Sequence, residues 1–590
     1  MTSKIVGGSF VISDLDCQAI VTPEDFTEEH RMIAETTRDY VNGEVMPNDE
    51  HLEKLDYDLT VKLMRSAGDL GLLGADVPEI YGGLGLDKVS STIISENLAR
   101  ASSFALSIGA HVGIGTLPIV FFGTTEQKKK YLPDLATGAK IAAYCLTEPT
   151  SGSDALGAKT TARLSDDGKH YILNGSKLYI TNAGFADIFI VYAKINGTDF
   201  TAFIVEKGDP GFTMGPEEKK MGIKGSSTRP LFFEDVKVPV ENLLGEIGKG
   251  HLIAFNILNI GRYKLAVGCL GAAKETIELA VKYANTRQQF QTPISRFPLI
   301  GKKLAEMNIQ TYILESMVYR TTGLFDNILK DIDHTSHDAG KTSAKGISEY
   351  ALECSINKVF ASEVLDFVAD EGLQIHGGYG FIQEYKVERI YRDSRINRIF
   401  EGTNEINRLL IPGTLVKKAM KGELPLLQKA QELQGELLSY MPGQTFEEML
   451  AEETHLVSMA KKVFLMVGGL AVQKYGMTLE KNQEILSCLA DMMIQIFAAE
   501  SGLLRTLKII QNQGEAKAAN AIQLTTVFVH EAFDKIEAYA KEALSTMEEG
   551  DVLRTQLSML KKLSRRSSVN TVGLKRDIAA RVIQGEKFIS

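Results

Sequence analysis

The spacing of hydrophobic residues changes twice along this 590-residue chain, and this pattern constrains the fold more than any other feature of the sequence. Up to about residue 140 the apolar residues recur every three or four positions, as in residues 61–73, which is typical of amphipathic helices. From 141 to about 244 the spacing falls to two, which indicates strands. After Gly250 the helical spacing returns and continues through the rest of the chain. The pattern therefore predicts a helical, a β and a second helical segment, in that order.

The β segment contains turn signals as well as strands. Two Asn-Gly pairs lie between apolar runs, and this dipeptide favours tight hairpin turns because both residues tolerate a positive φ. A third candidate pair of runs follows at 231–233 and 236–238. Several short strands with tight turns favour a small sandwich or barrel. The two turns, with the runs that they would join, are Asn174-Gly175 between 171–173 and 177–180, and Asn196-Gly197 between 188–192 and 200–205.

We assign the chain to the α+β class and expect four domains. Thr22 would cap a helix that begins at Pro23, and longer helices are expected at 251–285, from Leu299 onward and at 343–371. Residues 411–443 are rich in Pro and Gly and are expected to form a linker. The boundaries are 20–140 for an N-terminal helical domain, 141–250 for a small central β domain, 251–415 for a C-terminal helix bundle, and 416–590 for an additional helical domain.

The composition argues against several classes of protein. The formal net charge is −10, whereas nucleic-acid-binding proteins need a basic surplus. The five cysteines show no CxxC pair and the ten histidines no HExxH motif, so we expect neither a disulfide framework nor a metal site. The first residues lack the features of a targeting peptide, and no apolar run approaches the ~20 residues of a membrane span. A cytoplasmic location is therefore the default expectation.

Four short segments carry residues suited to ligand binding or chemistry. The first, 144–154 (YCLTEPTSGSD), leaves a strand and enters a loop whose N–H and hydroxyl groups suit a flat ligand with many acceptors. In the second, 177–184 (KLYITNAG), Tyr179 and Thr181 are two residues apart and therefore lie on the same face of a strand. Taken alone, each segment is explained at least as well by a surface turn or by core packing.

The third and fourth segments lie in the second helical part. In 374–381 (QIHGGYGF) the glycines permit close approach of a ligand, and His376 is expected to be a packed or surface histidine. In 399–411 (IFEGTNEINRLLI) Glu401 precedes a helix that Thr403 or Asn404 would cap. The helix start stabilises the ionised carboxylate, while apolar neighbours raise its pKa. A surface glutamate in a first helical turn is the alternative.

Taken together, these segments resemble the acyl-CoA dehydrogenase family. The order and spacing of TEPTSGSD, NGSKLYITNAG, NTRQQF, QIHGGYGF and IFEGTNEINR are far more specific than any one of them. The resemblance covers about residues 20–415, and the layout with an additional helical domain is similar to the very-long-chain branch. It implies FAD bound without a Rossmann fingerprint, consistent with the lack of a GxGxxG motif that opens a helix.

The resemblance also implies which residues contact FAD. Thr147 would lie near the pyrimidine edge of the flavin, Thr181 would donate to flavin N5, and Tyr179 would lie against the ring, where most relatives have Trp. Arg287, Phe290 and the segment 374–378 match positions that reach the FAD of a neighbouring subunit, which implies a homodimer or a dimer of dimers. The full expected set is Tyr144, Leu146, Thr147, Gly152, Ser153, Tyr179, Ile180, Thr181, Arg287, Phe290, Gln374, Gly377, Gly378, Thr403 and Glu405.

Glu401 matches the catalytic base of the family. Some branches carry the base at the position of Gly261, so Glu401 is the family-consistent candidate here. The implied reaction removes the α-proton of an acyl-CoA and transfers hydride from the β-carbon to flavin N5. It yields trans-2-enoyl-CoA in fatty-acid β-oxidation and passes electrons to electron-transfer flavoprotein. The positions that match contacts to acyl-CoA are Ser153, Asn259, where some relatives have Asp, Arg262 and Gly402.

The role of the additional domain and several rival functions stay open. In the very-long-chain branch this extension is linked to peripheral membrane association and chain-length preference. The basic cluster Lys561, Lys562, Arg565 and Arg566 suits acidic lipid headgroups or the phosphates of CoA, and a solvated helix face explains it equally well. The rival functions are an acyl-CoA oxidase that reduces oxygen, a dehydrogenase for short or branched acyl-CoAs, and a scaffold that kept the fold without the chemistry.

Overall fold

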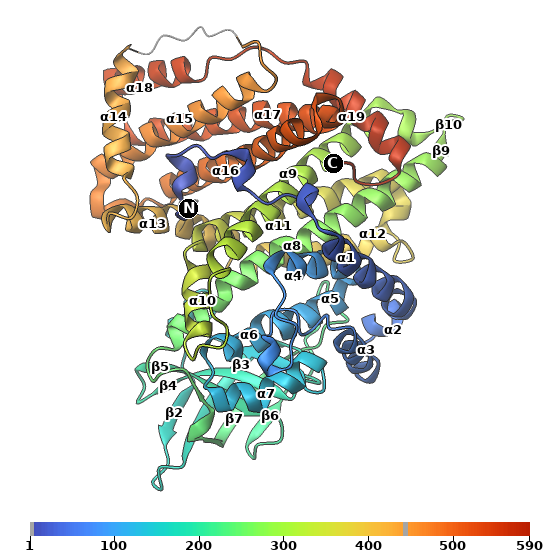
Figure 1. Cartoon of the computed structure of the whole chain (residues 1–590), viewed down its shortest axis with the longest axis vertical. Helices are drawn as coiled ribbons and strands as arrows, with labels where there is room; N and C mark the ends of the chain where they lie inside the picture. The colour runs from blue at the N-terminus through green and yellow to red at the C-terminus, as the bar shows by residue number, and fades with distance from the viewer. Residues whose placement is uncertain (1–4, 440–445) are drawn as a thin grey trace.

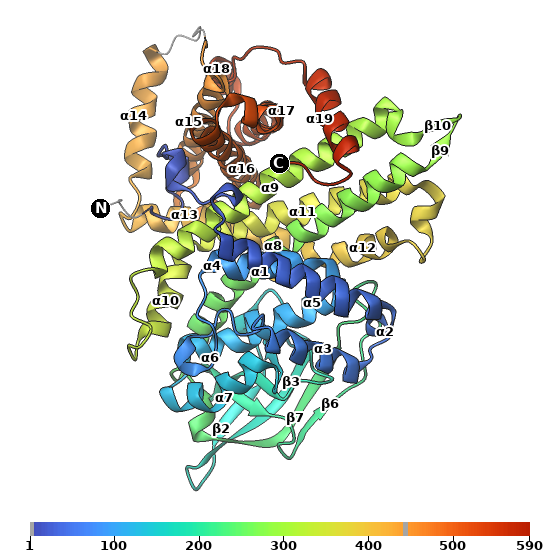
Figure 2. The same ribbon diagram turned by 45° about the vertical axis from the view of Figure 1, so that its right-hand side comes forward.

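The computed structural model describes residues 5–439 and 446–590 and confirms the predicted α+β class. In Figure 1 a sheet lies at the bottom, long helices cross the middle, and the last helices form a further layer at the top. The N-terminal helices pack between the sheet and the long helices, and the view in Figure 2 shows the same order of layers.

The N-terminal helical layer begins later than the sequence predicts. Thr22 and Pro23 start only a short 3-10 turn, Pro23–Asp25, and the first α-helix starts at Glu28. Thr27 caps this helix, because its side chain accepts a hydrogen bond from the His30 N–H at 3.2 Å. The helices are α1 (Glu28–Tyr40), α2 (Asp49–Glu53), α3 (Tyr57–Asp69), α4 (Lys88–Leu98), α5 (Ser102–Gly109), α6 (Leu117–Phe122) and α7 (Thr125–Thr137).

The sheet has eight strands in the order β6-β7-β3-β2-β4-β5-β8, and β1 pairs with β4 outside this path. The pairing is antiparallel except for β1 and β2 with β4, which are parallel. Aromatic and β-branched residues fill the core on the sheet, where Phe189, Phe203 and Phe233 are almost fully buried. The strands are β1 (Ala142–Cys145), β2 (Thr161–Leu164), β3 (His170–Thr181), β4 (Ile188–Ile195), β5 (Asp199–Glu206), β6 (Phe212–Met214), β7 (Thr228–Pro239) and β8 (Leu243–Leu244).

One of the two predicted Asn-Gly turns is confirmed and the other is wrong. Asn196-Gly197 joins β4 to β5. Asn174-Gly175 instead lies inside β3, where the register against β7 shifts between Leu173 and Gly175. A Cβ at position 175 would lie 2.6 Å from Thr160 Oγ1, and the backbone φ there is 146°. The glycine therefore permits close packing and a bulge instead of a chain reversal.

The second helical part is built on α8, a continuous helix of 37 residues that is about 55 Å long at 1.5 Å per residue. The helix predicted at 343–371 is two helices, because the chain breaks at Glu349-Tyr350. The elements are α8 (Gly250–Thr286), β9 (Gln288–Gln289), β10 (Thr292–Pro293), α9 (Pro298–Leu329), α10 (Ala339–Ser348), α11 (Ala351–His376), α12 (Lys386–Ser394) and α13 (Asn404–Met420).

The predicted linker at 411–443 is wrong at 411–420 and 426–439, which are helical, and only the connection at 421–425 with Gly422 and Pro425 is non-helical in its described part. Helix α13 runs through Pro412, which is buried, and packs on α11 and α16. Burial of Ile411 and Leu415 stabilises this helix despite the hydrogen bond that proline removes. Pro442 and Gly443 lie outside the described residues. The last helices are α14 (Leu426–Ser439), α15 (Ala451–Tyr475), α16 (Gln483–Gln513), α17 (Glu515–Met547), α18 (Gly550–Leu563) and α19 (Thr571–Gly585).

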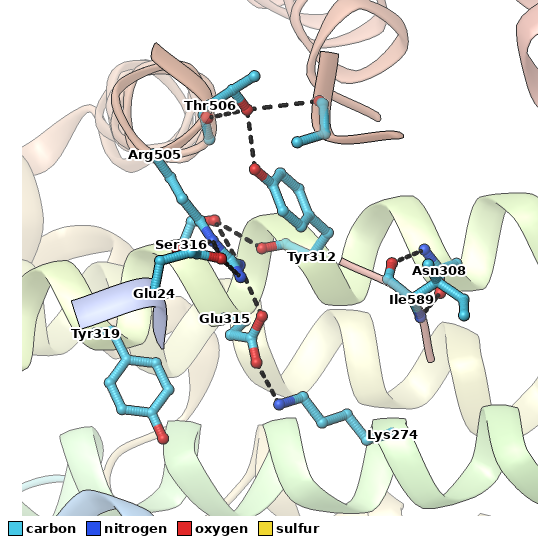
Figure 3. A network of polar contacts seen from close by, with 12 residues as sticks. Glu24, Lys274, Asn308, Tyr312, Glu315, Ser316, Tyr319, Arg505, Thr506 and Ile589 are labelled. Atoms are coloured by element: carbon cyan, nitrogen blue, oxygen red, sulfur yellow. Dashed lines mark hydrogen bonds and ion pairs between the residues drawn. The ribbon is translucent and has the colours of Figure 1, made fainter. Parts of the chain in front are cut away.

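A buried polar network fastens the last helices to the rest of the fold (Figure 3). Arg505 of α16 is 1% exposed and binds Glu24 at 2.6 Å and Glu315 of α9 at 2.6 Å. Lys274 of α8 binds the same Glu315. The N-terminal segment also contributes, because Lys508 of α16 binds Asp25 at 2.6 Å. Residues from both ends of the chain thus meet on α16 and hold the layers together.

Three helical segments are long and apolar enough to cross a membrane by length and composition alone. The sequence contains no unbroken apolar run of this length, so these segments were not expected. They are Lys88–Phe122, Ala451–Tyr475 and Gln483–Gln513. Within the fold, 78%, 61% and 89% of their apolar windows are buried, so packing inside the protein accounts for their composition.

Candidate active site

Glu401 lies in a strained turn between α12 and α13. Its φ is 57° and that of Gly402 is 78°, so two successive residues adopt a left-handed conformation that is costly for glutamate. Thr403 ends the turn and caps α13, as predicted, by accepting a hydrogen bond from the Ile406 N–H at 3.3 Å. Such a conformation persists only where surrounding contacts hold it.

Three side chains bond the backbone of this turn, and a fourth bonds one of the three. Asn407 Nδ2 donates to the carbonyl of Gly402 at 2.9 Å, and buried Lys358 donates to the same carbonyl at 2.7 Å. Arg262 Nε donates to the Glu401 carbonyl at 3.2 Å, and Asn259 accepts from Arg262 Nη1 at 2.9 Å. Within the described residues no hydrogen bond is donated by the N–H of Glu401 or Gly402. These two donors are therefore free for a ligand.

The Glu401 carboxylate lies directly against Gly261 of α8. A Cβ at position 261 would be 2.6 Å from Oε2 and 2.9 Å from Oε1, so no larger residue fits without moving the carboxylate. Oε2 is buried, and it has no hydrogen-bond partner in the described part of the chain. A buried carboxylate oxygen without a partner is costly unless a ligand completes the site.

Burial raises the pKa of Glu401 to about 7, although the charges of Arg262 and Lys358 oppose this effect. The cause is desolvation, as expected, but it arises where the carboxylate lies against Gly261 of α8, since Ile399 of the preceding apolar pair is exposed. A carboxylate with a pKa near the working pH is suited to act as a general base.

The loop 144–153 forms one wall next to this carboxylate. Burial raises the pKa of Tyr144 well above 10, and the neighbouring Tyr192, whose ring centroid is 5.4 Å away, and the charge of Glu401 add to this effect. The Tyr144 hydroxyl is buried and unpartnered among the residues described. Leu146 is buried, Thr147 is half-buried, and Gly152 and Ser153 are exposed. No atom lies within 4 Å of a Cβ placed on Gly152, so the loop is open on that side.

Strand β3 forms the adjoining wall. Its register against β7 shifts between Lys177 and Ile180, and at this bulge Tyr179 has φ 61° and a 60% exposed side chain. The Leu178 N–H donates to the Thr147 carbonyl at 2.8 Å, which joins strand and loop. Ile180 is buried and Thr181 half-buried at the end of the strand. The structure therefore brings together the first two sequence segments, as expected.

The first wall is anchored by an ion pair that sequence reasoning missed. Lys177 and Glu148 are both buried, and their Nζ and Oε1 atoms are 2.6 Å apart. Glu148 also accepts from the Thr160 N–H at 3.1 Å. Both residues belong to the quoted motifs, but only the fold shows that they are partners. Lys358, under the Glu401 turn, lies in a helix interior without any sequence signal.

A second cluster of expected cofactor residues lies far from the first. Arg287, Gly377 and Gly378 line a surface pocket of about 420 Å³ beside Tyr379, whose ring lies 5.3 Å from the Arg287 guanidinium. Arg287 follows Gly261 by 26 residues along α8, which corresponds to roughly 39 Å. The hairpin β9–β10 stands at this far end in Figures 1 and 2.

The remaining expected residues lie outside the surroundings of Glu401 or on the surface. Phe290 is 89% exposed at the tip of the hairpin, and Gln374 lies near the end of α11. His376 stacks on Tyr283 with 4.2 Å between ring centroids, which agrees with its expected packing role. Glu405 is exposed in the first turn of α13.

The residues of the first cluster fit a flavin. The two unpartnered polar groups, Tyr144 Oη and Glu401 Oε2, are suited to a flat polar ligand with an acyl group beside it. The open faces at Gly152 and at the exposed Tyr179 ring leave space for such a ligand. Groups of His, Cys, Asp and Glu that would hold a metal ion are not found among residues 5–439 and 446–590.

Comparison with known families matches four parts of the chain. The N-terminal, middle and C-terminal domains of acyl-CoA dehydrogenase match residues 27–139, 143–236 and 248–415. A further acyl-CoA dehydrogenase C-terminal domain matches residues 459–562, within the last helices.

Individual proteins agree with this assignment. The chain is 59% identical over 582 residues to a probable acyl-CoA dehydrogenase of Bacillus subtilis, which covers 99% of this chain and 98% of that protein. It is 44% identical over 377 residues to the human mitochondrial very long-chain specific acyl-CoA dehydrogenase, or 62% of this chain and 53% of that protein. A crystal structure of an acyl-CoA dehydrogenase complexed with FAD from Bacillus anthracis superimposes with a TM-score of 0.98 at 60% identity, covering 99% of this chain and 100% of that one. The chain therefore belongs to the acyl-CoA dehydrogenase family, whose members are FAD-dependent oxidoreductases.

Proposed function

We propose that this enzyme dehydrogenates an acyl-CoA thioester between Cα and Cβ, with Glu401 as the base that removes the α-proton. The observation that carries the proposal is the Glu401 carboxylate. It is held against Gly261, has an unpartnered Oε2 in the described structure, and has a pKa raised to about 7 by burial. A surface glutamate in a helical turn would show none of these properties.

The chain supplies three functions to this reaction. Glu401 accepts the α-proton, which it can do because its buried carboxylate is basic near neutral pH. The free N–H of Glu401 is suited to donate to the thioester carbonyl, which stabilises the negative charge that develops on that oxygen. Arg262 and Lys358 keep the turn in place by binding its carbonyls. Bound FAD supplies the hydride acceptor for the β-carbon.

The walls around Glu401 support FAD as the cofactor at this site. The loop from Tyr144 to Ser153 offers an unpartnered hydroxyl and an open backbone, and β3 presents Tyr179 and Thr181 beside it. We propose that Thr147 and Thr181 hydrogen-bond the flavin and that Tyr179 lies against the ring. The substrate would then lie beside Ser153 and Gly402. Arg262 and Asn259 affect it indirectly, because Arg262 binds the Glu401 carbonyl and Asn259 binds Arg262.

The two separated clusters support a homodimer. A single chain places Arg287 roughly 39 Å along α8 from Gly261 and hence from the base. Phe290 and Phe381 are 89% and 81% exposed near the pocket of Arg287, and large exposed aromatic side chains are typical of interfaces. We propose that this surface completes the flavin site of a second copy, with the guanidinium of Arg287 on the pyrophosphate.

Substrate length and electron acceptor are further proposals. The human relative is named for very long-chain substrates, and this supports a long-chain acyl-CoA for the present enzyme. Electron-transfer flavoprotein is the proposed acceptor. Anaerobic titration with saturated acyl-CoAs of increasing length, followed by mixing with electron-transfer flavoprotein or with oxygen, would identify both. Rapid peroxide formation in air would instead indicate an oxidase.

Glu401→Gln tests the central role. The variant should fold and keep its flavin, but flavin reduction by acyl-CoA should slow by about 10²–10⁴-fold or more, the usual contribution of a positioned general base. Glu542→Gln, an exposed position on α17, is the matched control and should reduce its flavin at the parent rate. Near-parental reduction by the Glu401→Gln protein would show that another group removes the proton.

A further inference from the structure

A pocket away from the proposed active site lies in the additional helical domain. It has a volume of about 870 Å³ and is lined by α17, by the end of α18 and by the connection to α19. This connection arcs from α18 to α19 at the top of Figure 2. The volume falls in the usual range for sites of small molecules.

Two polar side chains of this pocket are buried without a hydrogen bond. Ser564 is 7% exposed and His530 is 6% exposed, and both line the pocket. Neither Ser564 Oγ nor His530 Nε2 forms a hydrogen bond with any described residue, and the nearest charged neighbour of Nε2 is Glu453, whose Oε1 lies 3.8 Å away. Burial lowers the pKa of His530, and a neutral imidazole can still donate through Nε2–H. The buried Ser564 hydroxyl has no partner, and the His530 imidazole makes no hydrogen bond in the same cavity, which indicates that a polar ligand completes their bonding.

The charges that line the pocket favour an anion. Its three carboxylates are all paired, since Arg566 binds Asp534 and Glu537 while Lys575 binds Glu531. Among the described residues, Lys561, Lys562 and Arg565 have no ion pair, although all three line the same pocket. Two of them lie in the last turn of α18, where a cation also offsets the helix dipole. The interaction of these cations with the helix dipole does not explain why Ser564 and His530 are buried without a hydrogen bond.

A helix start adds to the positive character of the pocket. Thr571, the first residue of α19, lines it, so the N-terminal end of this 15-residue helix lies at its edge. The Thr571 and Gly573 N–H groups already bond Val569 and Asn570, so this end contributes through the helix dipole, which favours anions. The pocket thus combines a helix start, three cations without an ion pair among the described residues, and two buried polar groups without a hydrogen bond.

We propose that this pocket binds a small molecule that bears two or more phosphoryl groups, at a site separate from the acyl-CoA and flavin sites. Ser564 and His530 hydrogen-bond phosphoryl oxygens at the floor, and Lys561, Lys562 and Arg565 neutralise the charge at the rim. Several phosphoryl groups match three cations better than one does. A concave site with buried polar groups favours a soluble ligand over a flat lipid surface.

Inorganic pyrophosphate is the probe. The full chain, purified with its flavin, is titrated by calorimetry at two salt concentrations and should bind one pyrophosphate per chain at this pocket. Ser564→Ala keeps the net charge and removes only an unpartnered hydroxyl, so it should leave the thermal midpoint unchanged and weaken binding about tenfold. Lys561→Gln/Arg565→Gln should weaken binding further. The matched control Lys481→Gln/Lys517→Gln loses the same charge at exposed positions of this domain and should bind as the parent does.

Three outcomes would overturn the proposal. One is the absence of saturable pyrophosphate binding. Another is equal weakening in the pocket and control double variants with no effect of Ser564→Ala, which would indicate diffuse charge attraction. The last is sedimentation with phosphatidylglycerol vesicles that depends on Lys561 and Arg565 while pyrophosphate does not bind, which would make the surface a lipid contact. Glu401→Gln should bind pyrophosphate like the parent, so this test is independent of the dehydrogenase reaction.

Discussion

Gly261→Ala isolates the position of the base from its chemistry. The new Cβ would lie 2.6 Å from Glu401 Oε2, whereas non-bonded atoms in contact are about 3.5 Å apart, so the carboxylate must move by about 1 Å. A misplacement of this size in a catalytic group costs about 10²-fold in rate, or ~3 kcal/mol of activation free energy. Alanine is also favoured over glycine inside a helix by up to ~1 kcal/mol. We therefore expect a protein at least as stable as the parent but about 10²-fold slower.

The assay is anaerobic stopped-flow reduction of the flavin with a saturating long-chain acyl-CoA, together with thermal unfolding. Gly268→Ala is the control, because Gly268 lies seven residues further along α8 and no atom lies within 4 Å of its Cβ. That variant should keep the parent rate. Equal rates in the two folded variants would refute the inference that Gly261 sets the position of the Glu401 carboxylate.

Three further predictions concern pH, flavin binding and stability. Glu401 acts as a base only when ionised, and burial raises its pKa to about 7. The rate of flavin reduction should therefore rise with pH below about 7 and level off above it. A midpoint of this pH profile near 4.5 would contradict the argument that burial raises the pKa. Tyr144→Phe removes a hydroxyl unpartnered among described residues, so the thermal midpoint of the flavin-free protein should hold while the flavin dissociates more readily, measured as the ratio of flavin to protein absorbance. Arg505→Met leaves Glu24 and Glu315 unpaired and should cost about 3–5 kcal/mol in urea unfolding, against less than about 1 kcal/mol for Arg554→Met on the surface.

Local sequence patterns predicted the long elements well. The helical periods of α8 and α9 and the apolar runs of β4 and β5 identified these elements within a few residues, whereas the two runs predicted at 231–233 and 236–238 form the single strand β7. Thr403 was one of two predicted caps, with Asn404, because capping depends on residues only three positions apart, and the structure selects Thr403. Predictions failed where a local signal competed with packing. Gly175 was predicted to form a turn, but it lies within β3 and allows close contact with Thr160. Pro412 was predicted to lie in a linker, but it lies within helix α13 and is buried.

The sequence by itself determined the order of helical and β segments, the family and the candidate base, because periodicity and motif spacing are properties of neighbouring residues. Only the tertiary structure decided what surrounds that base. Gly261 and Arg262 are about 140 positions from Glu401. Gly261 lies against the Glu401 carboxylate and Arg262 binds the Glu401 carbonyl only after the chain has folded. The same holds for Arg505, which meets Glu24 across 481 positions. Whether a charged side chain is buried or paired depends on which distant helices and strands pack together. A local sequence pattern does not specify this packing.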